Sequence, residues 1–118
     1  MKLETNPKTI NAYLLNEWFN SEEQNPIIID VREESELEMA IFSKEFLHLP
    51  LSKVSLEYVQ EKIAGLLDRK IVVLCHAGIR SYNFGKWSLD NNIVSEIWSL
   101  EEGIDVWSKY VDPTIPRY

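Results

Sequence analysis

The chain of 118 residues has little cysteine: Cys75 is the single one. One cysteine cannot form an internal disulfide, nor can it supply a cysteine-based zinc site. It is typical of a protein in a reducing compartment, so we expect a cytoplasmic location. No apolar run approaches the roughly 20 residues of a membrane span, and the first residues lack the apolar segment of a secretory signal. We therefore expect no membrane partner.

Basic residues are also scarce, since 12 Lys and Arg face 19 Asp and Glu, for a net charge of −7. Nucleic acids and anionic membrane surfaces attract clusters of Lys and Arg, so neither is an expected partner. The acidic residues gather in the segment Glu33 to Glu38 and again at Glu101 and Glu102. A solvated helix face is the favoured interpretation of this segment, and a docking surface for a basic partner is the alternative.

The hydrophobic content of 45% is enough for a packed core. Short apolar runs alternate with helical patterns along the chain, and runs without polar residues are typical of strands buried on both faces of a parallel sheet. We expect strands at residues 27–29, 46–49, 71–74 and 95–98 and helices at residues 12–20, 33–39, 55–67, 81–90 and 104–110. The pattern predicts a single α/β domain over residues 1–118, with helices on both faces of a central, mostly parallel sheet.

The core of this domain is expected at about residues 10–110, followed by a tail at residues 111–118 that has two prolines and cannot be helical throughout. Asn11 is expected to cap the first helix and Ser55 the third. Leu56, Val59 and Ile63 would form the third helix's apolar face. An isolated domain of this size is expected to be a monomer.

Cys75 ends the predicted strand 71–74 and precedes a short loop, after which Ser81 opens a helix. Backbone N–H groups at a helix N-terminus and the helix dipole both favour negative charge, so a thiol in this setting is expected to ionise and react. The alternative is a small buried hydrophobic residue at a strand end. Gly78, Arg80 and Ser81 in the following residues favour the reactive interpretation.

Each residue of the loop has a role that its chemistry suits. Gly78 allows a backbone conformation with positive φ, and Arg80 offers a planar cationic fork to an anionic donor. Ser81 can cap the helix and make one further hydrogen bond. His76 either lines the mouth of the loop or is merely exposed.

For the other polar residues we favour structural roles over catalytic ones. Asp30, at the end of strand 27–29, is a possible general acid, but hydrogen bonding to neighbouring backbone is the favoured role. Arg32 is expected to pair with carboxylates. His48 lies in an apolar strand and is expected to be a core or edge residue rather than a metal ligand, so no metal is expected.

Four segments, in this order and spacing, resemble a single-domain rhodanese of the thiosulfate sulfurtransferase type. They are DVRE at 30–33, LPL at 49–51, IVVLCHAGIRS at 71–81 and GIDVW at 103–107, and the resemblance covers residues 10–107. It implies that Cys75 takes a sulfane sulfur from a small anionic donor and passes it to cyanide, a thiol or a protein acceptor. It also implies a substrate site formed by His76, Ala77, Gly78, Ile79, Arg80 and Ser81, with Asp30 and Arg32 as supporting residues and no cofactor.

The chain departs from the family pattern at two places outside the loop. Residues 39–46 lack the usual Gly-Ala pair, and Glu102-Gly103 stands where the family has Gly-Gly. The loop also lacks the Cys-Gly-Ser-Gly start of mercaptopyruvate enzymes, which favours thiosulfate or another persulfide as donor.

Two other functions remain open. A cysteine phosphatase or arsenate reductase uses a similar scaffold, but its loop is longer than the four residues between Cys75 and Arg80. A non-catalytic rhodanese-like regulatory or binding module is the other alternative. Such modules often lack the cysteine that this chain retains.

Overall fold

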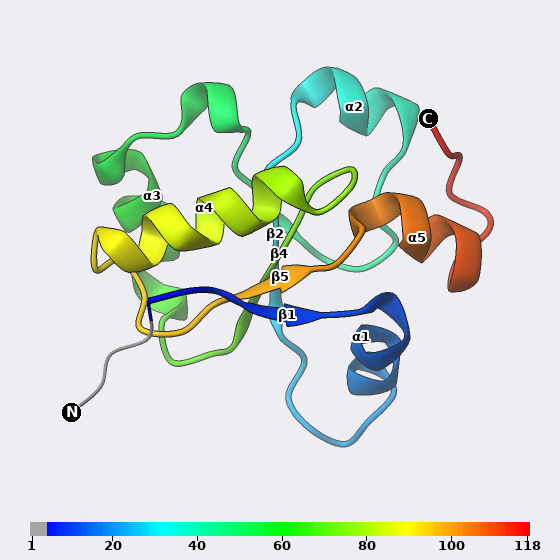
Figure 1. Ribbon diagram of the computed structural model, residues 1–118, viewed down its shortest axis with the longest axis horizontal. Helices are drawn as coiled ribbons and strands as arrows, with labels where there is room; N and C mark the ends of the chain where they lie inside the picture. Colours follow the sequence, from blue (N-terminus) through cyan, green and yellow to red (C-terminus); the bar gives the residue numbers. More distant parts are fainter. Residues whose placement is uncertain (1–4) are drawn as a thin grey trace.

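The computed structural model describes residues 5–118, which form a layered α/β domain (Figure 1). Its sheet has five strands in the order β1-β5-β4-β2-β3, and every pair of neighbours is parallel. The strands are β1 (Lys8–Ile10), β2 (Ile27–Asp30), β3 (Leu47–His48), β4 (Ile71–Leu74) and β5 (Trp98–Leu100). Because the strands are parallel, their carboxyl ends share one edge, where ligands bind in open α/β sheets.

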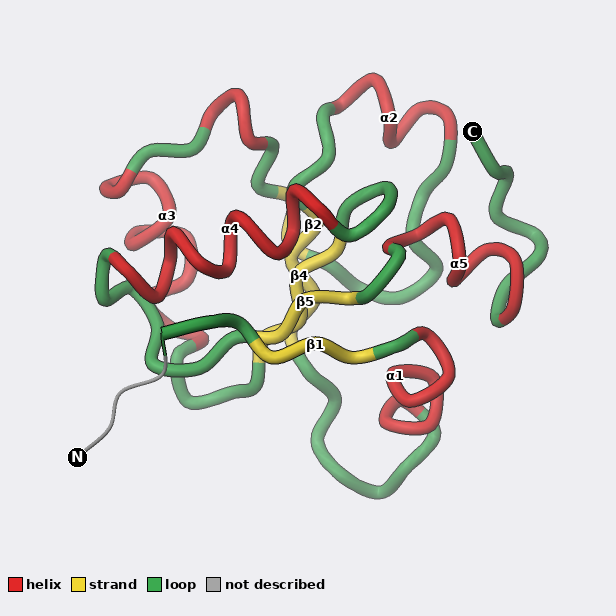
Figure 2. The backbone as a smooth tube through the Cα atoms, viewed as in Figure 1, coloured by secondary structure: helices red, strands yellow, loops and turns green. Residues whose placement is uncertain are grey.

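Helices cover both faces of the sheet, as the sequence pattern predicted. They are α1 (Ala12–Phe19), α2 (Glu34–Met39), α3 (Leu56–Ile63), α4 (Ile79–Asp90) and α5 (Gly103–Tyr110), with short 3₁₀ turns at Leu51–Lys53 and Ala64–Leu66. Figure 2 shows the yellow strands running between α3 and α4 on one side and α1 and α5 on the other. None of the helices in the described part of the chain is long and apolar enough to cross a membrane.

Strand β4 shows why the apolar runs lack polar residues. Its four side chains are at most 2% exposed and alternate between two core clusters. Ile71 and Val73 pack in the cluster with α3 and α4, whereas Val72 and Leu74 pack in the cluster with α1 and α5. Burial of each such side chain stabilises the fold by roughly 1.5–3 kcal/mol.

The sequence interpretation of the strands on one side of the sheet was wrong. The strand expected at 95–98 lies at Trp98–Leu100, and β1 was not anticipated. Val94 and Ile97 are buried, but they pack on the core from the connection before β5. In β1 only Ile10 is buried, and the strand is held by backbone bonds to the β5 segment, such as Lys8 N to the Ile97 carbonyl at 2.9 Å.

The helix caps were predicted correctly. The Asn11 side chain accepts a hydrogen bond from Leu14 N at 2.8 Å, and the Ser55 hydroxyl accepts one from Tyr58 N at 3.2 Å. The predicted apolar face of α3 was wrong at Leu56, which is 41% exposed. This residue is at the first position of the helix, whereas Val59 and Ile63 further along it are buried.

The segment 111–118 is not helical and returns along α5 to the neighbourhood of α2 (Figure 1). Buried Ile115 anchors it, since its carbonyl accepts a hydrogen bond from the Ser108 hydroxyl. Arg117 adds an ion pair to Asp105 of α5 at 2.8 Å. The fold therefore brings Tyr118 to the edge of the sheet at which Cys75 lies.

Candidate active site

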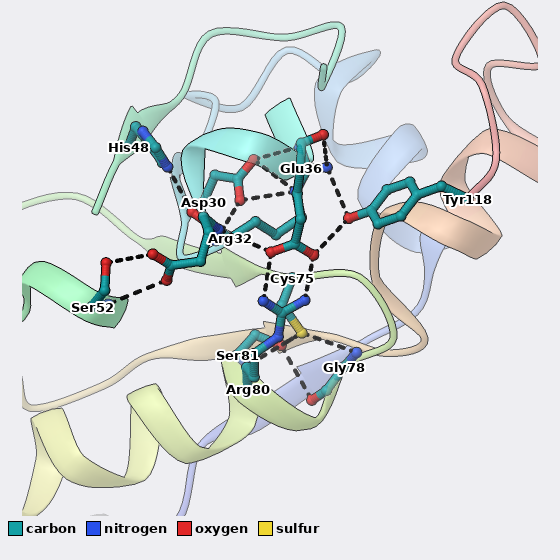
Figure 3. A network of polar contacts seen from close by, with 11 residues as sticks. Asp30, Arg32, Glu36, His48, Ser52, Cys75, Gly78, Arg80, Ser81 and Tyr118 are labelled. Carbon is teal, nitrogen blue, oxygen red and sulfur yellow. Dashed lines mark hydrogen bonds and ion pairs between the residues drawn. The ribbon is translucent and has the colours of Figure 1, made fainter. Parts of the chain in front are cut away.

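Cys75 follows β4 directly, and its sulfur lies at the N-terminus of α4 (Figure 3). Sγ accepts hydrogen bonds from Gly78 N at 3.1 Å and from Ser81 N at 3.3 Å. The helix begins at Ile79 rather than at Ser81 as predicted, because Gly78 caps it with a φ of +100°. Two backbone N–H groups and the positive end of a twelve-residue helix therefore converge on the sulfur, an arrangement typical of anion-binding sites.

Two buried hydroxyl groups extend this cradle. The Ser81 hydroxyl lies 3.4 Å from Sγ and 2.8 Å from the hydroxyl of Ser99 on β5. It also donates to the Gly78 carbonyl at 3.2 Å. A hydroxyl has one proton to donate, so with that proton on the Gly78 carbonyl the Ser81 oxygen accepts from the Cys75 thiol. The sequence analysis missed Ser99, because it ended the predicted strand at residue 98.

The first turn of α5 supports the loop that follows Cys75 through backbone hydrogen bonds. Ile104 N donates to the Cys75 carbonyl at 2.9 Å, and Asp105 N donates to the His76 carbonyl at 3.2 Å. Gly103 has a φ of +63°, and a Cβ there would lie 2.3 Å from the Cys75 carbonyl oxygen. Glu102 adopts a φ of 58°, a left-handed conformation that glycine adopts with less strain. At the first position of the family's Gly-Gly pair, this chain therefore has a bulkier residue in a left-handed conformation.

Arg80 does not present a free cationic fork, because Glu36 of α2 occupies it. Arg80 Nη1 and Nη2 lie 2.7 Å and 2.8 Å from the two carboxylate oxygens of Glu36. This hydrogen bonding lowers the pKa of Glu36 to about 2, against an opposing effect of burial. Glu36 in turn raises the pKa of Arg80. The sequence analysis placed Glu36 in the acidic segment only, and the capping box that it forms with Glu33 lacks the usual Ser, Thr, Asp or Asn at the cap.

Asp30 and Arg32 form an ion pair whose side chains are 0% exposed. Arg32 Nη2 lies 2.8 Å from Asp30 Oδ2, and Asp30 Oδ1 also accepts from Arg32 N at 3.0 Å. His48 Nε2 lies 2.6 Å from the Arg32 carbonyl oxygen. The pair thus braces the turn after β2, which leads into α2 and Glu36.

Tyr118 joins the two ion pairs and is a site residue that the sequence analysis missed. Its ring stacks on His76 with centroids 4.1 Å apart and planes at 14°. Its hydroxyl accepts from Arg32 Nη1 at 3.1 Å and donates to Glu36 Oε1 at 3.0 Å. Burial raises the pKa of the Tyr118 phenol, so it retains its proton at neutral pH.

Cys75 and the loop residues that follow it differ in exposure. The Cys75 side chain is 1% exposed, whereas Ile79 is 72% exposed at the outer side of the loop. A shallow hollow there is lined by Thr9, Ala77, Gly78, Ile79, Tyr82, Asn83, Ser99, Glu101 and Glu102. In residues 5–118 no group of three potential His, Cys, Asp or Glu ligands is arranged to hold a metal ion. The loop and the side chains around it therefore cover the sulfur almost completely.

A family model for the rhodanese-like domain matches residues 12–110. A rhodanese-related protein from Thermoplasma volcanium has 26% identity and a TM-score of 0.67, with 94% of this chain and 99% of that chain covered. An NAD-dependent persulfide reductase from A. fulgidus has 26% identity and a TM-score of 0.59, and the match spans 86% of this chain but 16% of that larger chain.

The As-Sb reductase from Leishmania major has 13% identity and a TM-score of 0.75, with 92% of this chain and 81% of that chain covered, which shows a shared fold. No curated protein matches the sequence. The family match covers most of the chain, and the solved rhodanese-related protein from Thermoplasma volcanium shares its fold. The chain therefore belongs to the rhodanese-like domain family.

Proposed function

We propose that this protein is a sulfurtransferase that moves a sulfane sulfur from thiosulfate or another persulfide donor to a thiol, cyanide or protein acceptor. The observation that carries the proposal is the sulfur of Cys75 at the N-terminus of α4, held by the N–H groups of Gly78 and Ser81. These donors suit both an attacking thiolate and the anionic persulfide that follows it. A reducing cytoplasm would keep the thiol available for each cycle.

The transfer takes place in two steps, each of which forms one bond to sulfur and breaks another. In the first, the Cys75 thiolate attacks the outer sulfur of thiosulfate, a new S–S bond forms, and the old S–S bond breaks with its electron pair leaving on sulfite. In the second, the acceptor attacks the outer sulfur of the persulfide, and the electron pair of the S–S bond returns to Cys75 as thiolate. Cyanide leaves as thiocyanate, and a thiol leaves as a new persulfide. No external oxidant or reductant is needed.

The surrounding residues divide the remaining work. Gly78 and Ser81 stabilise the sulfur anion through their N–H groups, and Arg80, paired with Glu36, lies in the first turn of the same helix. Asp30 and Arg32 support the turn that carries α2. The short loop between Cys75 and Arg80 suits one additional sulfur atom better than a tetrahedral phosphate.

Mass spectrometry of the intact protein tests the proposal directly. Incubation with thiosulfate should add about 32 Da, one sulfur atom, and dithiothreitol should remove it. Cys75→Ser should take up no sulfur while its circular dichroism and urea midpoint stay close to those of the parent. Phosphate-ester turnover without any sulfur adduct would instead favour a phosphatase, and absence of both would favour a regulatory module.

A further inference from the structure

The charge of Arg80 is cancelled at the place where a small anionic donor would need it. Both terminal guanidinium nitrogens bind the carboxylate of Glu36, at 2.7 Å and 2.8 Å. In Figure 3 the guanidinium is drawn between this carboxylate and the Cys75 sulfur. An anion that approaches the sulfur therefore meets a neutral ion pair instead of a cation, and it meets the negative charge of Glu36 behind it.

Glu36 is held in this position by more than Arg80. Its Oε2 also accepts from Glu33 N at 2.9 Å, the reciprocal bond of the capping box at the start of α2. Its Oε1 also accepts from the Tyr118 hydroxyl at 3.0 Å. Four donors thus fix the two oxygens, and the side chain is only 14% exposed. Displacement of Glu36 by a competing anion would break a set of charge-assisted bonds at once.

The groups behind Glu36 supply no spare positive charge. The Tyr118 hydroxyl links Glu36 to Arg32, but the charge of Arg32 is already paired with Asp30, and both of these side chains are fully buried. The charges of Asp30, Arg32, Glu36 and Arg80 therefore alternate in sign and cancel, so this group offers no net positive charge to an incoming anion. Across the loop, the backbone of another acidic residue, Glu102, lies beside Gly78.

We propose that Glu36, positioned by Tyr118, determines donor specificity by neutralising Arg80, so that the site prefers sulfane sulfur carried on a thiol over the dianion thiosulfate. This inference rests on the proposed sulfurtransferase function and narrows its donor class. When the Cys75 thiolate attacks the outer sulfur of an alkyl persulfide, the S–S bond breaks and an alkyl thiolate leaves with one negative charge, whereas attack on thiosulfate releases sulfite with two negative charges. Like charges brought together in a partly buried site repel each other, so the penalty is larger for the dianion.

The donor preference is measured as the ratio of two kcat/KM values, for thiosulfate and for 2-hydroxyethyl persulfide, with cyanide as the common acceptor. The rate of Cys75→Ser is subtracted as the uncatalysed background. Glu36→Gln should raise the thiosulfate-to-persulfide ratio about tenfold, through a lower KM for thiosulfate, because Arg80 regains its net charge. Glutamine suits the capping-box position as glutamate does, so the variant should fold.

Glu38→Gln is the matched control, since it removes one negative charge from an exposed position of the same helix. Its ratio should stay within about twofold of the parent, because exposed charges are largely screened. An unchanged or lower ratio in Glu36→Gln, or an equal rise in Glu38→Gln, would overturn the inference while leaving the sulfurtransferase function intact. Failure of both donors to load Cys75 in the parent protein, seen by mass, would remove the function and the inference together.

The positioning role of Tyr118 has its own readout. Tyr118→Phe keeps the ring that stacks on His76 but removes the hydrogen bond to Glu36, so the pKa of Glu36, followed by carboxyl NMR, should rise. Tyr110→Phe removes a hydroxyl from an exposed ring on α5 and should leave that pKa unchanged. An equal Glu36 pKa in the parent and in Tyr118→Phe would show that Tyr118 does not position Glu36.

Discussion

Arg80 and Asp30 show how much a residue's meaning depends on its partner. Arg80 is bound by Glu36 near the protein surface, with 36% of its side chain exposed, whereas Asp30 is bound by Arg32 in complete burial. A substitution in the first pair can change the net charge of the site with a modest effect on the stability of the fold. The second cannot lose a member without leaving an uncompensated charge in the core.

Loss of the Arg80 side chain should therefore impair catalysis more than folding. Arg80→Ala leaves Glu36 unpaired beside the sulfur, so kcat/KM for thiosulfate should fall by at least about tenfold and by more than kcat/KM for the persulfide. In the double variant Arg80→Ala with Glu36→Gln, part of the loss should be recovered, because the unpaired carboxylate is gone. Equal losses for both donors would contradict an electrostatic role for Arg80.

Loss of Asp30 should affect folding instead. Asp30→Ala removes the partner of buried Arg32 and should lower the free energy of unfolding by about 3–5 kcal/mol, measured with urea. Asp90→Ala breaks the exposed pair with Lys86 on α4 and is the control, with an expected change of about 0.3–0.5 kcal/mol. Similar effects in the two variants would mean that the buried pair adds no special stability.

At the scale of elements, the turn from β5 into α5 supports the loop of Cys75. Its backbone N–H groups satisfy the carbonyls of Cys75 and His76, which the loop itself leaves unpaired. This contact requires the close approach that Gly103 allows. The geometry of the sulfur cradle is thus shared between two helices that begin at the same edge of the sheet.

Gly103→Ala should separate these elements. The added Cβ would lie 2.3 Å from the Cys75 carbonyl oxygen in a left-handed conformation, so we expect a loss of at least about 1–3 kcal/mol in stability. Gly65→Ala is the matched control, since nothing lies within 4 Å of a Cβ there. It should be neutral or stabilise the protein by up to about 1 kcal/mol. Comparable urea midpoints for the two variants would refute the close approach at Gly103.

At the scale of the whole molecule, Glu36 ties together three parts of the chain. It lies on α2, binds Arg80 of α4 and accepts from Tyr118 of the segment after α5. The site is consequently a junction of segments that are distant in sequence, and acid should loosen this junction.

The pH dependence follows from the depressed pKa of Glu36. Its pKa is about 2 in the folded protein against 4.5 as the ordinary value, so the unfolded chain takes up the proton first as the pH falls. The stability that Glu36 contributes is complete above about pH 4.5 and is lost as the pH falls toward 2. Urea midpoints measured at pH 6 and pH 3 should therefore differ more in the parent protein than in Glu36→Gln. The same difference in both would exclude Glu36 as a source of acid sensitivity.

The sequence by itself determined the α/β class, the parallel sheet and the position of Cys75 between a buried strand and a helix. These features follow from local causes: an apolar run that is buried on both faces, the capping residues Asn11 and Ser55, and a glycine free to adopt positive φ. Local causes leave a signal in neighbouring residues, and so the loop could be recognised before the fold was known.

Only the tertiary structure decided which charges meet and where the weak strands lie. Glu36 binds Arg80, which is 44 residues away in the sequence, and Tyr118, which is 82 residues away. The chain has 12 basic and 19 acidic residues, so many other ion pairs were possible. The β1 strand is likewise held by backbone hydrogen bonds to β5, and these bonds require no particular pattern of side chains in β1. Long-range pairing depends on how the core orients each element, and that orientation leaves no trace in the residues next to Arg80 or Tyr118.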